Sequence, residues 1–73
     1  MVFETIQSII AEKLDLDAAE ITPSSSFMDM QVDSLYMVEI MLAIEDAFNI
    51  MIDDTAGMET VDDLVKYVEK KVG

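Results

Sequence analysis

Residues 32–48 form an uninterrupted apolar and acidic stretch, and this stretch constrains the fold of the chain most strongly. It contains neither Gly nor Pro, and Asp33 stands near its start. A short carboxylate at that place can cap the free N–H groups of a first helical turn. We therefore predict a single helix over this stretch, with Ser34 at its beginning.

This predicted helix carries two apolar faces when its residues are placed at 100° intervals. The first face is the predicted core stripe, and it comprises Met37, Ile40, Met41, Ile44, Ala47 and Phe48. The opposite face mixes apolar and acidic side chains, and it comprises Leu35, Val38, Glu39, Leu42, Glu45 and Asp46. A chain of 73 residues has too little mass to surround a helix, and buried carboxylates without partners would be costly. We interpret the second face as a partner-binding surface, and the alternative is a set of ordinary exposed hydrophobic residues.

Two further segments have helical periodicity. The first covers residues 3–14, with Phe3, Ile6, Ile9, Ile10 and Leu14 on its apolar side and Gln7, Ser8, Glu12 and Lys13 opposite. The second begins after Thr60, which forms a near capping box with Asp63. Its apolar positions are Val61, Leu64, Val65 and Val68, with Tyr67 beside them. The fold class is therefore all-α.

The connections between these helices differ in length. Residues 15–32 form a long loop, and its expected apolar anchors are Leu16, Ile21 and Phe27. Asn49 is expected to end the central helix. After it, residues 50–52 form a short apolar plug, residues 53–57 hold one helical turn at most, and Met58 points inward.

The chain has no Cys and no His, which limits its chemistry. The fold must be held by packing, because no disulfide or thiolate ligand is available. Ser34 has no histidine to activate it and lies in no Gly-x-Ser-x-Gly turn, so we predict that the chain is not an enzyme. Thiol chemistry would require a prosthetic group that supplies the sulfur.

The charge distribution points to basic protein partners. The net charge is −12, and thirteen of the sixteen Asp and Glu residues lie between Lys13 and Lys66. This balance argues against nucleic acid as a partner. A one-sided negative field steers basic partners toward the surface, although it can also serve solubility alone. The chain has no apolar run that could span a bilayer and no secretory signal at residues 1–4, so we expect a cytoplasmic protein.

The acidic first loop does not make a metal site. Asp15 and Asp17 begin like an EF-hand, but Glu20 stands where that loop needs Gly and Ser26 stands where it needs Glu. Weak cation binding near the central helix, by Asp29 with Asp33, is left open. A solvated acidic surface is the favoured interpretation, and we predict no metal site.

The motif Asp33-Ser34-Leu35, followed by Val38-Glu39, resembles the acyl carrier protein family. Residues 60–68 resemble the closing helix of that family, so the resemblance covers nearly the whole chain. It implies a small four-helix bundle within one domain over residues 1–73, with three main helices, a short third helix and a long loop after the first helix.

The resemblance also implies a cofactor, which is 4′-phosphopantetheine joined to Ser34 through a phosphodiester, with Asp33 and Leu35 beside it. Such an arm carries acyl groups as thioesters. The implied partners are a phosphopantetheinyl transferase and acyl-transfer, ketosynthase or acyl-ligase enzymes with basic docking patches, and the chain is expected to be a monomer. The expected acyl pocket comprises Phe27, Met37, Ile40, Met41, Ile44, Ile52 and Met58.

Two positions depart from the family pattern. Tyr36 stands where the family usually has an acidic residue, and Gln31 stands where it usually has Gly. The resemblance implies a carrier for fatty acid synthesis or for a related specialised acyl, polyketide or lipid pathway, and these departures favour the specialised pathway over main fatty acid synthesis. A D-alanyl carrier, a peptidyl or aryl carrier, and an unmodified acidic interaction module are the alternatives.

Overall fold

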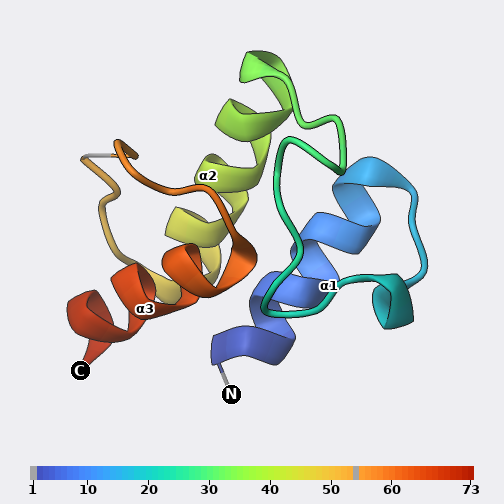
Figure 1. Ribbon diagram of the computed structural model, residues 1–73. Coiled ribbons are helices and arrows are strands. Elements are labelled where there is room, and N and C mark those ends of the chain that lie inside the picture. Colours follow the sequence, from blue (N-terminus) through green and yellow to red (C-terminus); the bar gives the residue numbers. More distant parts are fainter. Residues whose placement is uncertain (1, 54) are drawn as a thin grey trace.

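The computed structural model describes residues 2–53 and 55–73, which form three α-helices and a short 3₁₀ helix (Figure 1). The helices are α1 (Val2–Leu14), η1 (Ala18–Glu20), α2 (Ser34–Phe48) and α3 (Val61–Val72). The described residues contain no strand, although Ser26 and Thr60 form an isolated antiparallel bridge. The predicted all-α class and its three main helices are confirmed.

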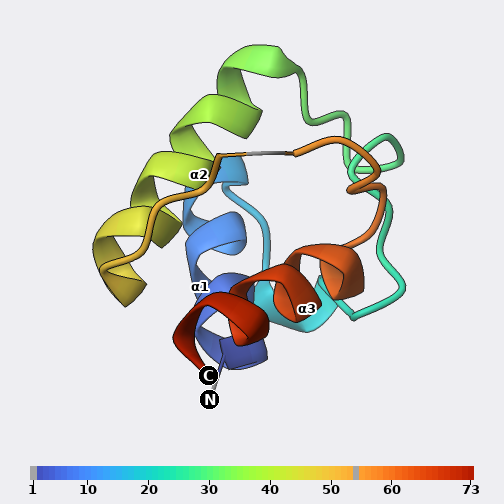
Figure 2. The ribbon, with the colours of Figure 1, turned by 90° about the vertical axis from the view of Figure 1, so that its left-hand side faces the viewer.

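Helix α1 is the centre of the packing. It contacts both α2 and α3, whereas α2 and α3 make little direct contact with each other. Figure 2 shows α2 and α3 standing apart, with the yellow and orange connection running between them below the start of α2. The segment that connects α2 to α3 therefore covers the core on the side where these two helices do not meet.

The core is built from one apolar stripe of each helix and two residues of the first loop. Its buried members are Ile6, Ile10, Ala11, Ile21, Phe27, Ile40, Met41, Ile44, Val61, Leu64, Val65 and Val68. Burial of a large aliphatic side chain stabilises a fold by about 1.5–3 kcal/mol, so these stripes hold the helices together without any covalent link.

The helix ends follow the caps expected from the sequence. The carboxylate of Asp33 accepts a hydrogen bond of 2.9 Å from the N–H of Tyr36, and Asn49 ends α2 in the left-handed conformation with φ 55°. Thr60 and Asp63 form a complete capping box at α3. At the end of α1, Asp15 is left-handed with φ 56°, and this permits a Schellman-type bond from the N–H of Leu16 to the carbonyl of Ala11.

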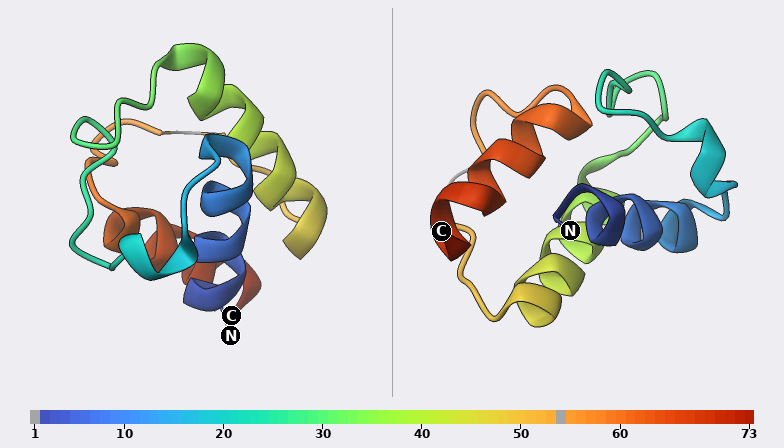
Figure 3. Two further views of the ribbon diagram at one scale, coloured as in Figure 1. Left: turned by 90° about the vertical axis from the view of Figure 1, so that its right-hand side faces the viewer. Right: turned by 90° about the horizontal axis from the view of Figure 1, so that it is seen from below.

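The first loop is fastened to the start of α3. The N–H of Phe27 donates to the carbonyl of Glu59, and the N–H of Val61 donates to the carbonyl of Ser25, each over 3.0 Å. Figure 3 shows the two segments meeting beside the first turn of α3. The expected anchors Ile21 and Phe27 are buried, but Leu16 is exposed, because the turn at the end of α1 directs it outward.

Some positional predictions were wrong. The short extra helix is η1, where Asp17 and Glu20 form a capping box; the described residues between α2 and α3 contain no helix, and Asp54, within the predicted turn, lies outside them. Gln7 is half-buried, since its amide donates to the carbonyls of Ala18 and Ile21. Ala47 is exposed because its single methyl group lies in the last turn of α2, where Phe48 packs against the core instead.

The apolar plug after α2 is incomplete. Ile50 and Ile52 are half-buried and pack against the core, but Met51 is 76% exposed. Met58 packs inward as predicted. None of the helices described is long and apolar enough to cross a membrane.

Candidate functional site

Ser34 is the first residue of α2, and its side chain is exposed. The preceding residue, Asp33, fixes the helix start through its bond to the N–H of Tyr36, and its carbonyl accepts the N–H of Met37 over 2.9 Å. Within the described residues, the N–H groups of Ser34 and Leu35 donate to no protein acceptor. The start of α2 therefore offers an accessible hydroxyl beside two free N–H donors and the positive end of the helix dipole.

Residues 26–32 form a tight turn immediately before the start of α2. The hydroxyl of Ser26 accepts the N–H of Met28 over 3.1 Å, and the N–H of Val32 donates to the carbonyl of Phe27 over 3.0 Å. Gln31 lies in this turn with φ 59°, a left-handed conformation that favours Gly. The backbone thus explains why Gly is expected at this position, and Gln31 adopts the same conformation at a steric cost.

The outer face of α2 is largely open to solvent. Leu35, Val38 and Leu42 are 66%, 54% and 59% exposed. Glu39 and Asp46 are exposed beside them, and neither forms an ion pair with a described lysine. This face combines an apolar strip with uncompensated negative charge, which suits a basic partner with an apolar centre.

Glu45 does not belong to this open face, although the sequence analysis placed it there. It is half-buried, and its carboxylate accepts a hydrogen bond of 2.7 Å from the N–H of Ile52. The helical wheel placed Glu45 wrongly because it does not account for neighbouring loops. A long polar side chain can bend toward a loop whose backbone N–H needs an acceptor.

A groove with a cavity volume of about 240 Å³ runs between α2 and the segment that follows it. Its lining residues are Met37, Val38, Met41, Leu42, Glu45, Ile52 and Thr55. Three residues of the expected acyl pocket, Met37, Met41 and Ile52, thus lie together in this groove. Ile40 and Ile44 are completely buried in the core and line no part of it.

The remaining expected pocket residues lie elsewhere. Phe27 and Met58 line a cavity of about 380 Å³ beside the bridge between Ser26 and Thr60. The expected acyl pocket therefore does not form one cavity: its residues are distributed over two cavities and the buried core.

A model of the family described as "Phosphopantetheine attachment site" matches residues 4–68 of this chain. The chain is 47% identical, over 70 residues, to an acyl carrier protein of Streptococcus pneumoniae serotype 4. The aligned residues make up 96% of this chain and 95% of that protein. An acyl carrier protein of Streptococcus pyogenes serotype M1 is 46% identical over 70 residues, with coverage of 96% and 95%. The chain belongs to the acyl carrier protein family.

Membership in this family establishes the cofactor as covalently attached 4′-phosphopantetheine. The start of α2 fits such a group. The first turn contains no acidic residue, and its N–H donors and helix dipole favour a phosphate. Members of this family interact with phosphopantetheinyl transferases and with acyl-transfer enzymes.

No group of three or more His, Cys, Asp or Glu side chains within the described ranges could hold a metal ion. Asp29 and Asp33 therefore have no third acidic ligand, and Asp33 already caps α2.

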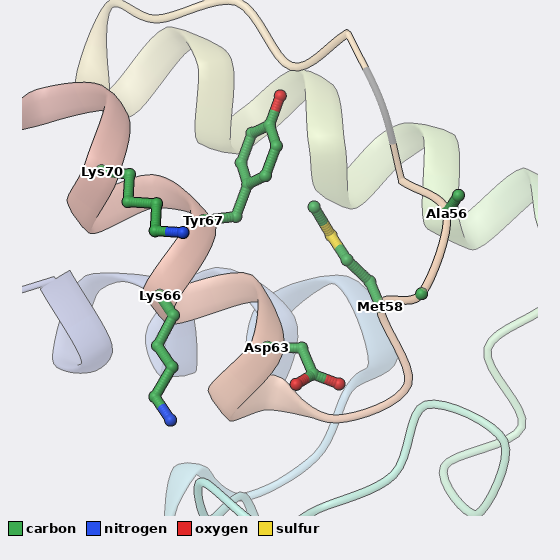
Figure 4. Close-up of a pocket in the computed structure, with 7 residues that line it drawn as sticks. Ala56, Met58, Asp63, Lys66, Tyr67 and Lys70 are labelled. Atoms are coloured by element: carbon green, nitrogen blue, oxygen red, sulfur yellow. The ribbon is translucent and has the colours of Figure 1, made fainter.

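A third cavity, of about 280 Å³, lies against α3 (Figure 4). Its lining includes Met58, Asp63, Lys66, Tyr67 and Lys70. Sequence reasoning missed this cavity because it depends on how residues 56–58 fold over α3. Gly57, with φ 83°, is the signal that the chain turns sharply there.

Proposed function

We propose that Ser34 is the attachment site of 4′-phosphopantetheine, and that this chain carries acyl groups as a non-catalytic, monomeric carrier of one domain. The observation that carries this proposal is the exposed hydroxyl of Ser34 at the first turn of α2, in a chain that matches the attachment-site family.

The other serines are less suitable. The hydroxyl of Ser25 accepts the N–H of Thr22 over 2.9 Å, and the hydroxyl of Ser24 lies 3.1 Å from that of Thr22. Ser26 caps the turn before α2, and Ser8 lies inside α1. Among the serines that the structure describes, only Ser34 combines a hydroxyl without a hydrogen-bond partner with a position at the start of an α-helix.

Each part of the site has a task in this proposal. The attached group supplies a thiol on a flexible arm, which holds an acyl chain as a thioester. The N–H groups of Ser34 and Leu35 favour the phosphate, while Glu39 and Asp46 attract basic partner enzymes. The partners supply the catalysis.

The groove beside α2 supports an aliphatic cargo. Five of its seven lining residues are apolar, and the other two are Glu45 and Thr55. The one carboxylate in this lining, that of Glu45, already accepts the N–H of Ile52, and the rest of the wall is mostly apolar, so the groove favours an aliphatic chain over a charged amino group. Fatty acid synthesis or a related acyl pathway is therefore the proposed setting. Because Tyr36 replaces the acidic residue that is usual in the family, the partner enzymes of this chain are proposed to differ from those of other carriers.

Intact-mass measurement tests the attachment. The chain expressed with a phosphopantetheinyl transferase should gain the mass of one phosphopantetheinyl group, and Ser34→Ala should gain none. Ser26→Ala is the matched control and should be modified like wild type. Modification of Ser34→Ala would overturn the assignment.

A further inference from the structure

Residues 50–53, which we call the strap, leave the end of α2 and reach α3 on the side where these two helices make little direct contact. Ile52 lies within the strap, is half-buried, and forms one wall of the groove beside α2. The opposite wall consists of α2 residues such as Met41. The position of Ile52 therefore sets how wide the groove is.

Glu45 fastens the strap to α2. Its backbone carbonyl accepts the N–H of Ile50 over 3.2 Å, and its carboxylate accepts the N–H of Ile52 over 2.7 Å. A bond from a backbone N–H to a carboxylate is stronger than one between neutral groups. The bond between Ile52 and Glu45 is also half-buried, so water competes less for its donor and acceptor.

Tyr67 fastens the strap to α3. Its hydroxyl donates to the carboxylate of Asp53 over 2.6 Å and accepts the N–H of Asp53 over 3.3 Å. Figure 4 shows Tyr67 pointing from α3 toward the connecting segment. The nitrogen of Lys71 lies 3.7 Å from the Asp53 carboxylate and 5.5 Å from the Tyr67 ring centre. The Tyr67 hydroxyl and the Lys71 charge hold the pKa of Asp53 below its ordinary value, because both favour the charged form of its carboxylate.

Adjacent strap residues are thus fastened to different helices, Ile52 to α2 and Asp53 to α3. We propose that Glu45 and Tyr67 are positioning residues that hold Ile52 as the groove wall and thereby limit the length of acyl chain that the groove shelters. This inference rests on the proposed carrier function. It assigns Glu45 to the groove and leaves Glu39 and Asp46 for partner docking.

The first experiment measures amide hydrogen exchange in the unmodified chain, where no cargo is involved. Tyr67→Phe removes one hydroxyl and keeps the ring. The Ile52 N–H should then exchange about five-fold faster, while the N–H groups of Ile40 and Ile44 keep their rates. Tyr36→Phe is the matched control, because it removes a tyrosine hydroxyl from the exposed side of α2, and it should leave Ile52 unchanged.

Glu45 is tested by a matched pair. Glu45→Ala removes the acceptor and should also accelerate exchange at Ile52, whereas Glu45→Gln keeps an amide oxygen and should restore most of the protection. Wild-type exchange at Ile52 in both Tyr67→Phe and Glu45→Ala would overturn the proposal.

The second experiment attaches saturated acyl groups of increasing length through the Ser34 arm and follows the thermal midpoint at fixed pH and salt. In wild type, the midpoint should rise with chain length and then level off when the groove is full. In Tyr67→Phe, the plateau should come about two methylenes later, since a released Ile52 lets the groove open. Glu12→Gln, which changes one charge on α1, should keep the wild-type plateau.

The outcomes separate the two proposals. A normal rise with the same plateau in wild type and Tyr67→Phe overturns the positioning role and leaves the carrier function intact. A wild-type thermal midpoint that does not change with acyl length would mean that the acyl chain is not held inside the groove. That result would contradict the positioning role and the sheltering of cargo in the proposed function. Failure of Ser34 to accept the arm overturns the proposed function before either comparison begins.

Discussion

The carboxylate of Asp33 accepts the N–H of Tyr36 over 2.9 Å, and it does so across Ser34, whose own hydroxyl is left exposed. Asp33 is therefore a helix cap as well as a neighbour of the proposed attachment site. Asp33→Ala should lower the free energy of unfolding by about 1 kcal/mol, whereas Asp33→Asn, which keeps a capping oxygen, should lower it much less. Urea unfolding of the two variants measures this difference, and equal losses would contradict the cap.

The two faces of α2 make opposite predictions for stability. Ile44 is completely buried, so Ile44→Ala should cost about 2–5 kcal/mol through lost burial and a residual cavity. Leu42 lies on the outer face and is 59% exposed, so Leu42→Ala should stay within about 0.5 kcal/mol of wild type. Thermal or urea unfolding checks both, and similar losses would mean that the outer face is packed.

Charge reversal on the outer face should slow partner binding. Glu39→Lys with Asp46→Lys removes two exposed carboxylates from α2. Association with the phosphopantetheinyl transferase should be slower at low salt, and the deficit should shrink as salt rises. The matched control is Glu4→Lys with Glu12→Lys, which makes the same change in net charge on exposed residues of α1. Equal association rates for the two double variants would show that only total charge matters.

The left-handed conformation of Gln31 predicts a stabilising substitution. Its φ of 59° is costly for a residue with a Cβ, by roughly 1 kcal/mol, and Gly avoids this cost. Gln31→Gly should therefore raise the thermal midpoint, although greater freedom in the unfolded chain offsets part of the gain. Gln31→Ala keeps the steric cost and serves as the control. A lower midpoint for Gln31→Gly than for Gln31→Ala would contradict the strain.

Asp63 gives a pH dependence with a defined sign. The N–H groups of Glu59 and Thr60 hold the pKa of Asp63 below its ordinary value of 3.8. A lowered pKa in the folded chain means that the charged carboxylate stabilises the fold above about pH 4, and that this contribution is lost as the pH falls through the folded-state pKa. The difference in thermal midpoint between wild type and Asp63→Asn should be constant from pH 7 to 5 and should shrink below pH 4. A constant difference down to pH 3 would exclude this linkage.

The main helices and their ends could be predicted from the sequence because each depends on local signals. Apolar periodicity placed α1, α2 and α3, and Asp33, Asn49 and Thr60 marked their ends through capping preferences that act within one turn. The exposure of Ser34 and of Leu35, Val38 and Leu42 followed from the same helical pattern.

Two of the errors share a physical cause, which is that hydrophobicity alone does not show where backbone groups need partners. Gln7 and Glu45 are polar, so the pattern placed them outward, yet both turn inward to satisfy backbone groups of neighbouring loops. The spacing of Asp17 and Glu20 is that of a capping box and could have indicated η1. The division of the expected acyl pocket depended on long-range packing, for which the sequence carries no local signal.

The fastening of α3 to the first loop has a consequence for how the chain folds. The N–H groups of Val61 and Asp62 donate to the carbonyls of Ser25 and Pro23, so the first turn of α3 is completed by residues far away in the sequence. A peptide of residues 59–73 would lack these acceptors and would form little helix by itself. Helices α1 and α2 pack against each other across the first loop alone, whereas the first turn of α3 needs residues that lie further back in the sequence, and closing a longer loop costs more conformational entropy and slows folding. The last helix in the sequence is thus also expected to be the last to form during folding.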